Sequence, residues 1–102
     1  MPTPIKNPNL KKALKEVNPD LGKIILMKDN GYFYLTSDDK VWSDRISNFY
    51  FNEILINSFR DLSIREWVYE IIDVLIQDRF DVTQDMEPWQ VELKEDAIKA
   101  GY

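Results

Sequence analysis

The chain has 102 residues, of which 44% are hydrophobic, so it is long enough to bury one core and too apolar to be disordered. It has no cysteine and no histidine, which excludes disulfide bonds, nucleophile chemistry based on histidine or cysteine, and the common zinc sites. Its net charge of −5 is uneven, because residues 1–60 hold nine Lys/Arg against seven Asp/Glu, whereas residues 61–102 hold four against eleven.

The N-terminal segment predicts a cytoplasmic protein that starts with a short helix. Residues 1–12 lack the apolar run of a signal peptide, and no stretch of the chain is long and uncharged enough to span a membrane. Asn7 is a good helix cap, and Pro8 suits the first helical position. The expected helix ends before Pro19. Its apolar face carries Leu10, Leu14 and Val17.

Residues 24–37 predict a β-hairpin. Asn30-Gly31 is a favoured pair for a two-residue turn in which both residues take positive φ. This turn pairs Asp29 with Tyr32 and thereby fixes the register of the remaining pairs. Both faces are partly apolar, so the aromatic side chains could pack in the core, be covered by a partner or stack on nucleic-acid bases. We favour core packing, because few basic residues accompany them.

The next two segments differ in their patterns. Residues 37–51 predict mostly loop, although a short helix capped by Ser37 or Asp38 could begin there. Residues 52–59 are rich in β-branched and apolar side chains and predict a third strand. This strand would lead directly into the main helix.

The clearest local signal is the start of that helix at residue 63. Ser63 and Glu66 form a capping box, in which the serine oxygen accepts from a first-turn N–H and the glutamate reaches back to the N–H of the cap. Leu62 and Trp67 stand at the two positions of a hydrophobic staple. The helix runs to about Gln77. Its apolar side consists of Ile64, Trp67, Val68, Ile71, Ile72 and Leu75.

The opposite side of the main helix is polar. It carries Arg65, Glu66, Tyr69, Glu70 and Asp73. A helix with one apolar and one polar side usually covers a core. We therefore interpret the apolar side as core rather than as a groove or face that binds a partner.

The C-terminal part predicts a connection followed by a last helix. Residues 78–86 show no periodicity, and Gly101 is expected to end a helix that spans residues 88–100. This helix would align Trp89, Leu93, Ala97 and Ala100. The pattern predicts an α+β fold of about three antiparallel strands against a main amphipathic helix, in the order α-β-β-loop-β-α plus a C-terminal extension. We expect residues 1–78 to form the domain and residues 79–102 an acidic extension packed on it.

The sequence contains no pattern typical of an enzyme or a cofactor site. Its three glycines do not cluster into a phosphate-binding loop. Asp38, Asp39 and Asp44 come closest to a cation site, but they lack the alternating oxygen ligands and the terminal glutamate of a calcium loop. We therefore predict a non-enzymatic protein with no cofactor and no metal ion.

Two stretches, "DNGYFYLTSDD" and "ILINSFRDLSIREWV", resemble a group of small, mostly uncharacterised proteins encoded by bacteriophages, prophages and plasmids. That group shares a GYFYF-type hairpin and an LNDLTLEEW-type strand, turn and helix. The likeness covers roughly residues 10–76, with Phe59-Arg60 where the group usually has Leu-Asn and with a longer middle segment. The matched positions are Gly31 to Tyr34, Asp61, Leu62, Ser63, Ile64, Glu66 and Trp67. The resemblance implies the fold and an origin in a mobile element of a bacterial host, and it transfers no catalytic residue.

The acidic second half predicts binding to a protein. Binding to a phosphate backbone depends on cations, whereas an acidic face suits a basic partner, such as another protein's nucleic-acid-binding surface. Together with the resemblance, this favours an inhibitor of a host defence protein, of the anti-defence or anti-CRISPR kind. The candidate partner-binding residues are Glu66, Glu70, Asp73, Asp78, Asp81, Asp85 and Glu87. A surface that is only solvated is the competing interpretation.

A nucleic-acid-binding accessory protein is the alternative function. It would use the hairpin aromatics Tyr32 and Tyr34. Its cations would be Lys11, Lys12, Lys15, Lys23 and Lys28. Clustering of these lysines beside the tyrosines would favour nucleic-acid binding, and their dispersal would favour protein binding. A structural or oligomerisation role leaves no distinct mark in the sequence.

Overall fold

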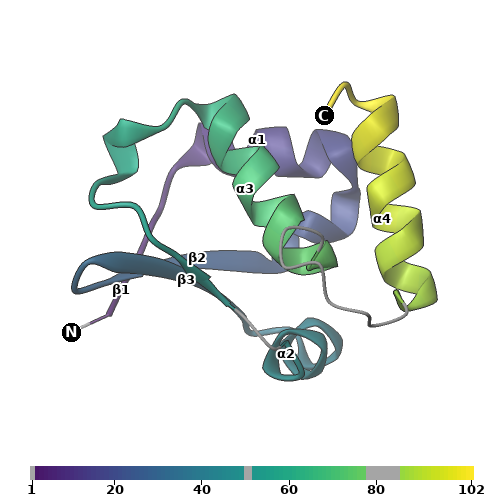
Figure 1. The fold of residues 1–102 in the computed structure, drawn as a ribbon, viewed down its shortest axis with the longest axis horizontal. Helices are drawn as coiled ribbons and strands as arrows, with labels where there is room; N and C mark the ends of the chain where they lie inside the picture. The colour runs from purple at the N-terminus through teal and green to yellow at the C-terminus, as the bar shows by residue number, and fades with distance from the viewer. Residues whose placement is uncertain (1, 50–51, 78–85) are drawn as a thin grey trace.

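The computed structural model describes residues 2–49, 52–77 and 86–102 (Figure 1). The elements in chain order are β1 (Thr3–Pro4), α1 (Pro8–Val17), the 3-10 helix η1 (Pro19–Lys23), β2 (Ile24–Asp29), β3 (Tyr32–Ser37), α2 (Lys40–Ser47), β4 (Glu53–Ile54), the 3-10 helix η2 (Phe59–Asp61), α3 (Ile64–Ile76) and α4 (Pro88–Lys99). The fold is α+β, as the sequence predicts.

The strands form one antiparallel sheet in the order β1-β2-β3-β4. The predicted hairpin is confirmed with its register, from Ile24 opposite Ser37 to Asp29 opposite Tyr32. Gly31 takes a φ of 77°, but Asn30 does not take a positive φ, so the prediction that both turn residues do so is wrong. A turn with positive φ only at its second central residue still needs glycine there. Alternate residues of β3 are buried and half-buried, so only one face of the hairpin enters the core.

The helices lie largely to one side of this sheet. Figure 1 shows α1 and α3 above the hairpin, α4 alongside them, and α2 at the end of the sheet from which β3 leaves. Asn7 accepts from the N–H groups of Asn9 and Leu10, which confirms the predicted cap of α1. The predicted C-terminal helix is also confirmed as α4, which contacts α3 and α1. The predicted connection over residues 78–86 lies outside the described residues except for Met86.

The capping box at the start of α3 is confirmed. The Ser63 hydroxyl accepts from the Glu66 N–H at 3.1 Å, and a Glu66 carboxylate oxygen accepts from the Ser63 N–H at 3.0 Å. The helix ends where Gln77 takes a left-handed conformation with a φ of 56°. Its predicted apolar side is buried except for the half-buried Ile64. The interpretation of this side as core is therefore confirmed.

Trp67 stands at the centre of the core, with an exposed fraction of 0%. Its ring meets the ring of Phe33 edge-on at 4.8 Å between centroids and stacks on that of Phe59 at 5.2 Å. Its indole N–H donates to the Phe59 carbonyl oxygen at 2.7 Å. One side chain thus joins α3 to β3 and to η2.

The prediction of a third strand over residues 52–59 is wrong in length. Only Glu53–Ile54 pairs with β3 as β4. The side chain of Asn52 takes the place of a strand backbone, because it accepts from the Leu35 N–H at 3.0 Å and donates to the Leu35 carbonyl at 2.8 Å. Beyond β4 the Ile56 N–H donates back to the Ile54 carbonyl, which turns the chain away from the sheet.

The prediction of mostly loop over residues 37–51 is also wrong, because α2 occupies Lys40–Ser47. Its cap is Asp39, whose carboxylate accepts from the Trp42 N–H at 3.2 Å. Ser37, one of the two caps considered, is instead buried and donates to the Lys23 carbonyl at 2.6 Å. The helix is eight residues long and buries only Trp42 and Ile46, too few positions for a clear period.

Strand β1 is a further difference from the predicted sheet. Thr3 and Pro4 pair with Lys28 and Met27 at the outer edge of β2. The two residues of β1 are too few to show a strand pattern in the sequence, and one of them is a proline. An edge strand tolerates the missing N–H of proline. This pairing therefore depends on the preformed hairpin rather than on local preference.

The capping box gives a first prediction on stability. Ser63→Ala combined with Glu66→Ala is expected to lower the free energy of unfolding by about 1 to 2 kcal/mol, because first-turn N–H groups lose their acceptors. Urea denaturation followed by tryptophan fluorescence measures the change. Ser43→Ala with Glu92→Ala, at exposed positions inside helices, serves as the control. Equal free energies of unfolding for the two double variants would contradict the stabilising role of the capping box.

The core gives a second prediction. Trp67→Ala is expected to destabilise the domain by about 3 to 5 kcal/mol, because it leaves a cavity and removes both ring contacts. Tyr69→Ala, two residues further along the same helix and 56% exposed, is expected to change stability by less than about 0.5 kcal/mol. Denaturant melts of both variants make the comparison. If Trp67→Ala leaves the free energy of unfolding nearly unchanged, this face of α3 does not support the core.

Candidate functional site

The acidic residues on α3 form the part of the predicted binding face that the structure describes most fully. Glu66 is exposed, and Glu70 and Asp73 are half-buried on the same side of the helix. The hydrogen bonds from Ser63 hold the pKa of Glu66 below its usual value, which keeps this carboxylate charged. Tyr69, exposed by 56%, lies three residues after Glu66 and four before Asp73.

The other predicted acidic residues do not all join this face. Glu87 is exposed and precedes α4, where its carboxylate accepts from the Trp89 indole at 3.2 Å and its N–H donates to the Gln90 side chain. It borders a cavity at the opposite end of α3 from Glu66. The remaining predicted residues lie outside the described residues, and they are Asp78, Asp81 and Asp85.

Helices α3 and α4 run antiparallel and hold the acidic face in place. The Gln90 side chain donates to the Leu75 carbonyl at 3.0 Å, which joins the start of α4 to the end of α3. At the other end, Arg65 donates to the Gly101 carbonyl and lies over the Tyr102 ring at 4.5 Å. These two pairs fix the helices side by side, and a depression lies between them.

This depression is a groove with a volume of about 190 Å³. We call it the α3–α4 groove. Its lining consists of Tyr69, Ile72, Asp73, Ile76, Lys94, Ala97, Ile98 and Tyr102. Sequence reasoning assigned the side of Tyr69 to solvent and did not find the groove, because the groove exists only once α4 packs against α3. One signal was present in the sequence. Val91 and Ile98 are apolar residues of the last helix that do not belong to its predicted apolar face.

A second cavity, of about 220 Å³, lies between α2 and the start of α4. Arg45 is placed over the rings of both Trp42 and Trp89, at 4.8 Å from each centroid. Such contacts orient the guanidinium and stabilise the packing of α2 against α4. The buried amides of Gln77 and Gln90 beside it donate to backbone carbonyls. The polar groups of this cavity thus serve the fold.

The hairpin tyrosines are on the face of the sheet that points away from the core. The rings of Tyr32 and Tyr34 lie 6.1 Å apart, and the Tyr32 hydroxyl donates to Asp29 at 3.3 Å. The negative charge of Asp29 is the largest cause that raises the pKa of Tyr32, and Glu53 adds to it. These acids give the tyrosine pair a negative surrounding that disfavours a phosphate backbone.

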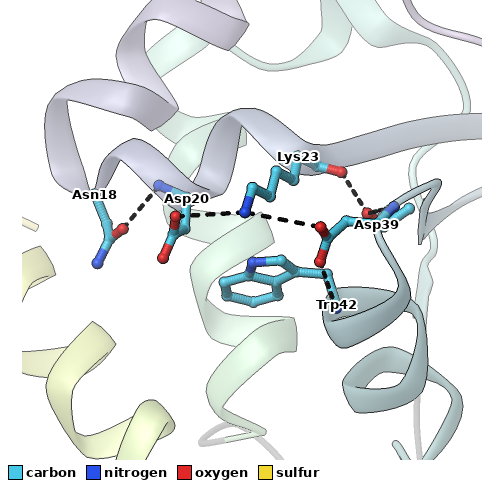
Figure 2. Close-up of polar contacts among 6 residues, drawn as sticks. Asn18, Asp20, Lys23, Asp39 and Trp42 are labelled. Atoms are coloured by element: carbon cyan, nitrogen blue, oxygen red, sulfur yellow. Dashed lines mark hydrogen bonds and ion pairs between the residues drawn. The ribbon is translucent and has the colours of Figure 1, made fainter.

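The five lysines considered for nucleic acid are dispersed. Figure 2 shows Lys23 between Asp20 and Asp39, with distances of 3.8 and 3.7 Å. Lys28 is paired with Phe33 and lies over its ring, so its side chain is on the sheet face opposite to that of the two tyrosines. The other three lysines belong to α1, on the helical side of the sheet, and are Lys11, Lys12 and Lys15.

The carboxylates weighed as a cation site have other roles. Asp39 caps α2 and pairs with Lys23, and Asp44 pairs with Lys40 at 3.3 Å. Within residues 2–49, 52–77 and 86–102, no three acidic side chains are grouped as a metal site requires. No helix in the described part of the chain is long and apolar enough to cross a membrane.

Comparison of the chain with models of known protein families, with curated proteins and with solved structures found no match. The resemblance to phage and plasmid proteins therefore stays a prediction from two short stretches.

The tyrosine pair gives a prediction on titration. Asp29→Asn is expected to lower the pKa of Tyr32 toward its usual value of 10.0, because it removes the negative charge that disfavours the phenolate. Titration of tyrosine labelled with ¹³C at the ring, followed by NMR, measures this pKa. Asp44→Asn removes an acid of α2 and serves as the control. An unchanged pKa of Tyr32 in the Asp29→Asn variant would contradict the conclusion that Asp29 gives the tyrosine pair a negative environment.

Proposed function

We propose that the chain is a non-enzymatic protein of phage or mobile-element type that acts by binding another protein through the acidic side of α3. A host defence protein with a basic, nucleic-acid-binding surface is the kind of partner that fits. The observation that carries the proposal is the row of Glu66, Glu70 and Asp73 beside the exposed Tyr69. Carboxylates around an exposed aromatic ring combine charge steering with an apolar anchor.

The charge balance of the two neighbouring helices supports this proposal. Together α3 and α4 carry six carboxylates and three cations. One cation, Arg65, is held by the Gly101 carbonyl and the Tyr102 ring. The surface these helices share is therefore negative, and a basic partner would be attracted to it over distances of about a Debye length.

The alternative function as a nucleic-acid-binding accessory protein has one supporting observation, the adjacent rings of Tyr32 and Tyr34 on the outer sheet face. Asp29 and Glu53 beside them, and the pairing of Lys23 with two aspartates, count against it. Base-stacking surfaces combine aromatic rings with nearby cations, and this face of the sheet has the rings but few cations. Protein binding is therefore the better supported function.

The proposed function is tested by charge reversal. Glu70→Lys with Asp73→Lys is expected to weaken binding to the partner and to reduce the salt dependence of binding, because the face loses its attraction for cations. The partner is first captured from a bacterial lysate treated with nuclease, so that nucleic-acid bridges are removed, and affinity is then measured at low and high salt. The thermal transition should move little, because charges at a helix surface contribute about 0.5 kcal/mol or less each.

A matched control separates the face from overall charge. Glu16→Lys with Asp38→Lys changes the net charge equally at two exposed positions outside α3 and α4. This control should bind as the parent does. Equal affinity of the α3 double reversal and the parent would show that the acidic side is only a solvated surface.

A further inference from the structure

The α3–α4 groove combines a buried apolar floor with exposed apolar walls. Ile72, Ile76 and Ala97 form the floor and are buried. Tyr69 on α3 and Ile98 on α4 form the walls, with exposed fractions of 56% and 62%. A concave apolar surface that stays open to solvent is the usual shape of a binding site for an apolar side chain.

Exposed hydrophobic side chains are more frequent on the two helices that form this groove than elsewhere in the described chain. Among the described residues five large hydrophobic side chains are exposed, and three of them belong to α3 and α4: Tyr69, Val91 and Ile98. Val91 stands seven residues, or about two helical turns, before Ile98 on the same side of α4 and lies beyond the groove lining. The other two are isolated on α2 and after β4. Scattered exposure would need no explanation, whereas an exposed apolar side chain on each wall of one groove, Tyr69 and Ile98, does.

Carboxylates flank both walls. On α3, Glu66 precedes Tyr69 by three residues and Asp73 follows it by four. On α4, Glu95 follows Val91 by four residues and precedes Ile98 by three. Residues at these spacings are neighbours on a helix surface. Of the charged side chains, Asp73 on α3 and Lys94 on α4 line the groove itself, so the α3 wall is acidic and the α4 wall carries a cation next to Glu95.

We propose that the α3–α4 groove binds a basic amphipathic helix of a partner protein. The apolar side chains of that helix enter the groove, and its lysine or arginine side chains pair with Glu66, Asp73 and Glu95. This inference rests on the proposed function and names the segment that the partner presents. The lining on α3 runs from Tyr69 to Ile76, a length of roughly 10 Å, which matches about two turns of a bound helix.

Charge complementarity selects this occupant over a second copy of the chain. A symmetric dimer would place the groove of one copy against that of the other, and so would bring the same carboxylates face to face. The net charge of −5 adds to this repulsion. A basic helix instead offers cations to the acidic α3 wall.

The test uses three synthetic peptides of about 18 residues that carry a fluorescent label. The first has leucines at i, i+3, i+4 and i+7 with lysines between them, the second has the same composition in scrambled order, and the third has glutamate in place of lysine. Fluorescence anisotropy at low and physiological salt measures binding to the whole chain. Only the first peptide should bind, because only it joins an apolar stripe to positive charge.

Ile98→Ser tests the groove directly. It should weaken binding of the first peptide about tenfold or more, because one apolar wall is lost. Val41→Ser, at a position 56% exposed on α2, should bind as the parent does. Failure of the first peptide to bind, equal binding of the scrambled peptide, or unchanged binding by Ile98→Ser would each overturn the proposal. A dimer in sedimentation that Ile98→Ser dissociates would also overturn it, because the occupant would be a second copy.

The same peptide separates this proposal from the proposed function. If Glu70→Lys with Asp73→Lys weakens binding to the captured partner while Ile98→Ser leaves both partner and peptide binding unchanged, the acidic face acts alone and the groove proposal fails. If Ile98→Ser weakens binding while the charge reversal has no effect, the charged face has no role and both proposals fail. If both variants lose binding and keep the melting transition of the parent, the result supports both proposals.

Discussion

The burial of Trp67 is the constraint on which the rest of the structure depends. Its indole N–H has an acceptor only because η2 places the Phe59 carbonyl at 2.7 Å, and its ring fits only because Phe33 of β3 and Phe59 lie on either side. A buried indole without an acceptor would cost about 1 to 3 kcal/mol. The 3-10 turn, the hairpin and the start of α3 are therefore fixed relative to one another, and the polar side of α3 is consequently turned outward.

Local chemistry explains why the hairpin and α3 were predictable. Asn30-Gly31 sets a turn whose length determines every pair of β2 and β3, and Ser63 with Glu66 marks the first turn of α3. Helix α2 was not predictable, because an eight-residue helix with two buried positions has no clear period. The length of β4 was not predictable, because a contact between distant residues decides it. Asn52 replaces the strand backbone opposite Leu35, seventeen residues earlier in the chain. No window of the sequence contains both partners.

The candidate site divides in the same way. Its acidic part follows from charge and helical spacing, which place Glu66 and Asp73 on one side of α3. Its apolar part depends on α4, which is held by Gln90 at one end and by Arg65 at the other, across 15 and 36 residues. The position of Ile98 opposite Tyr69 arises from these two contacts. Periodicity within either helix contains no information about it.

The two interpretations of the acidic surface, solvated or functional, differ in the apolar residues that accompany the charges. A surface that only maintains solubility needs carboxylates but has no reason to place Tyr69, Val91 and Ile98 among them. In a small domain, exposed apolar side chains promote self-association, and adjacent like charges oppose it. Under the proposed function, the carboxylates beside the α3–α4 groove would oppose pairing of two copies of the chain and would attract a basic partner by the same field. In that proposed complex, the sign of the charge selects the partner, and the groove supplies the apolar contact that charge alone does not give.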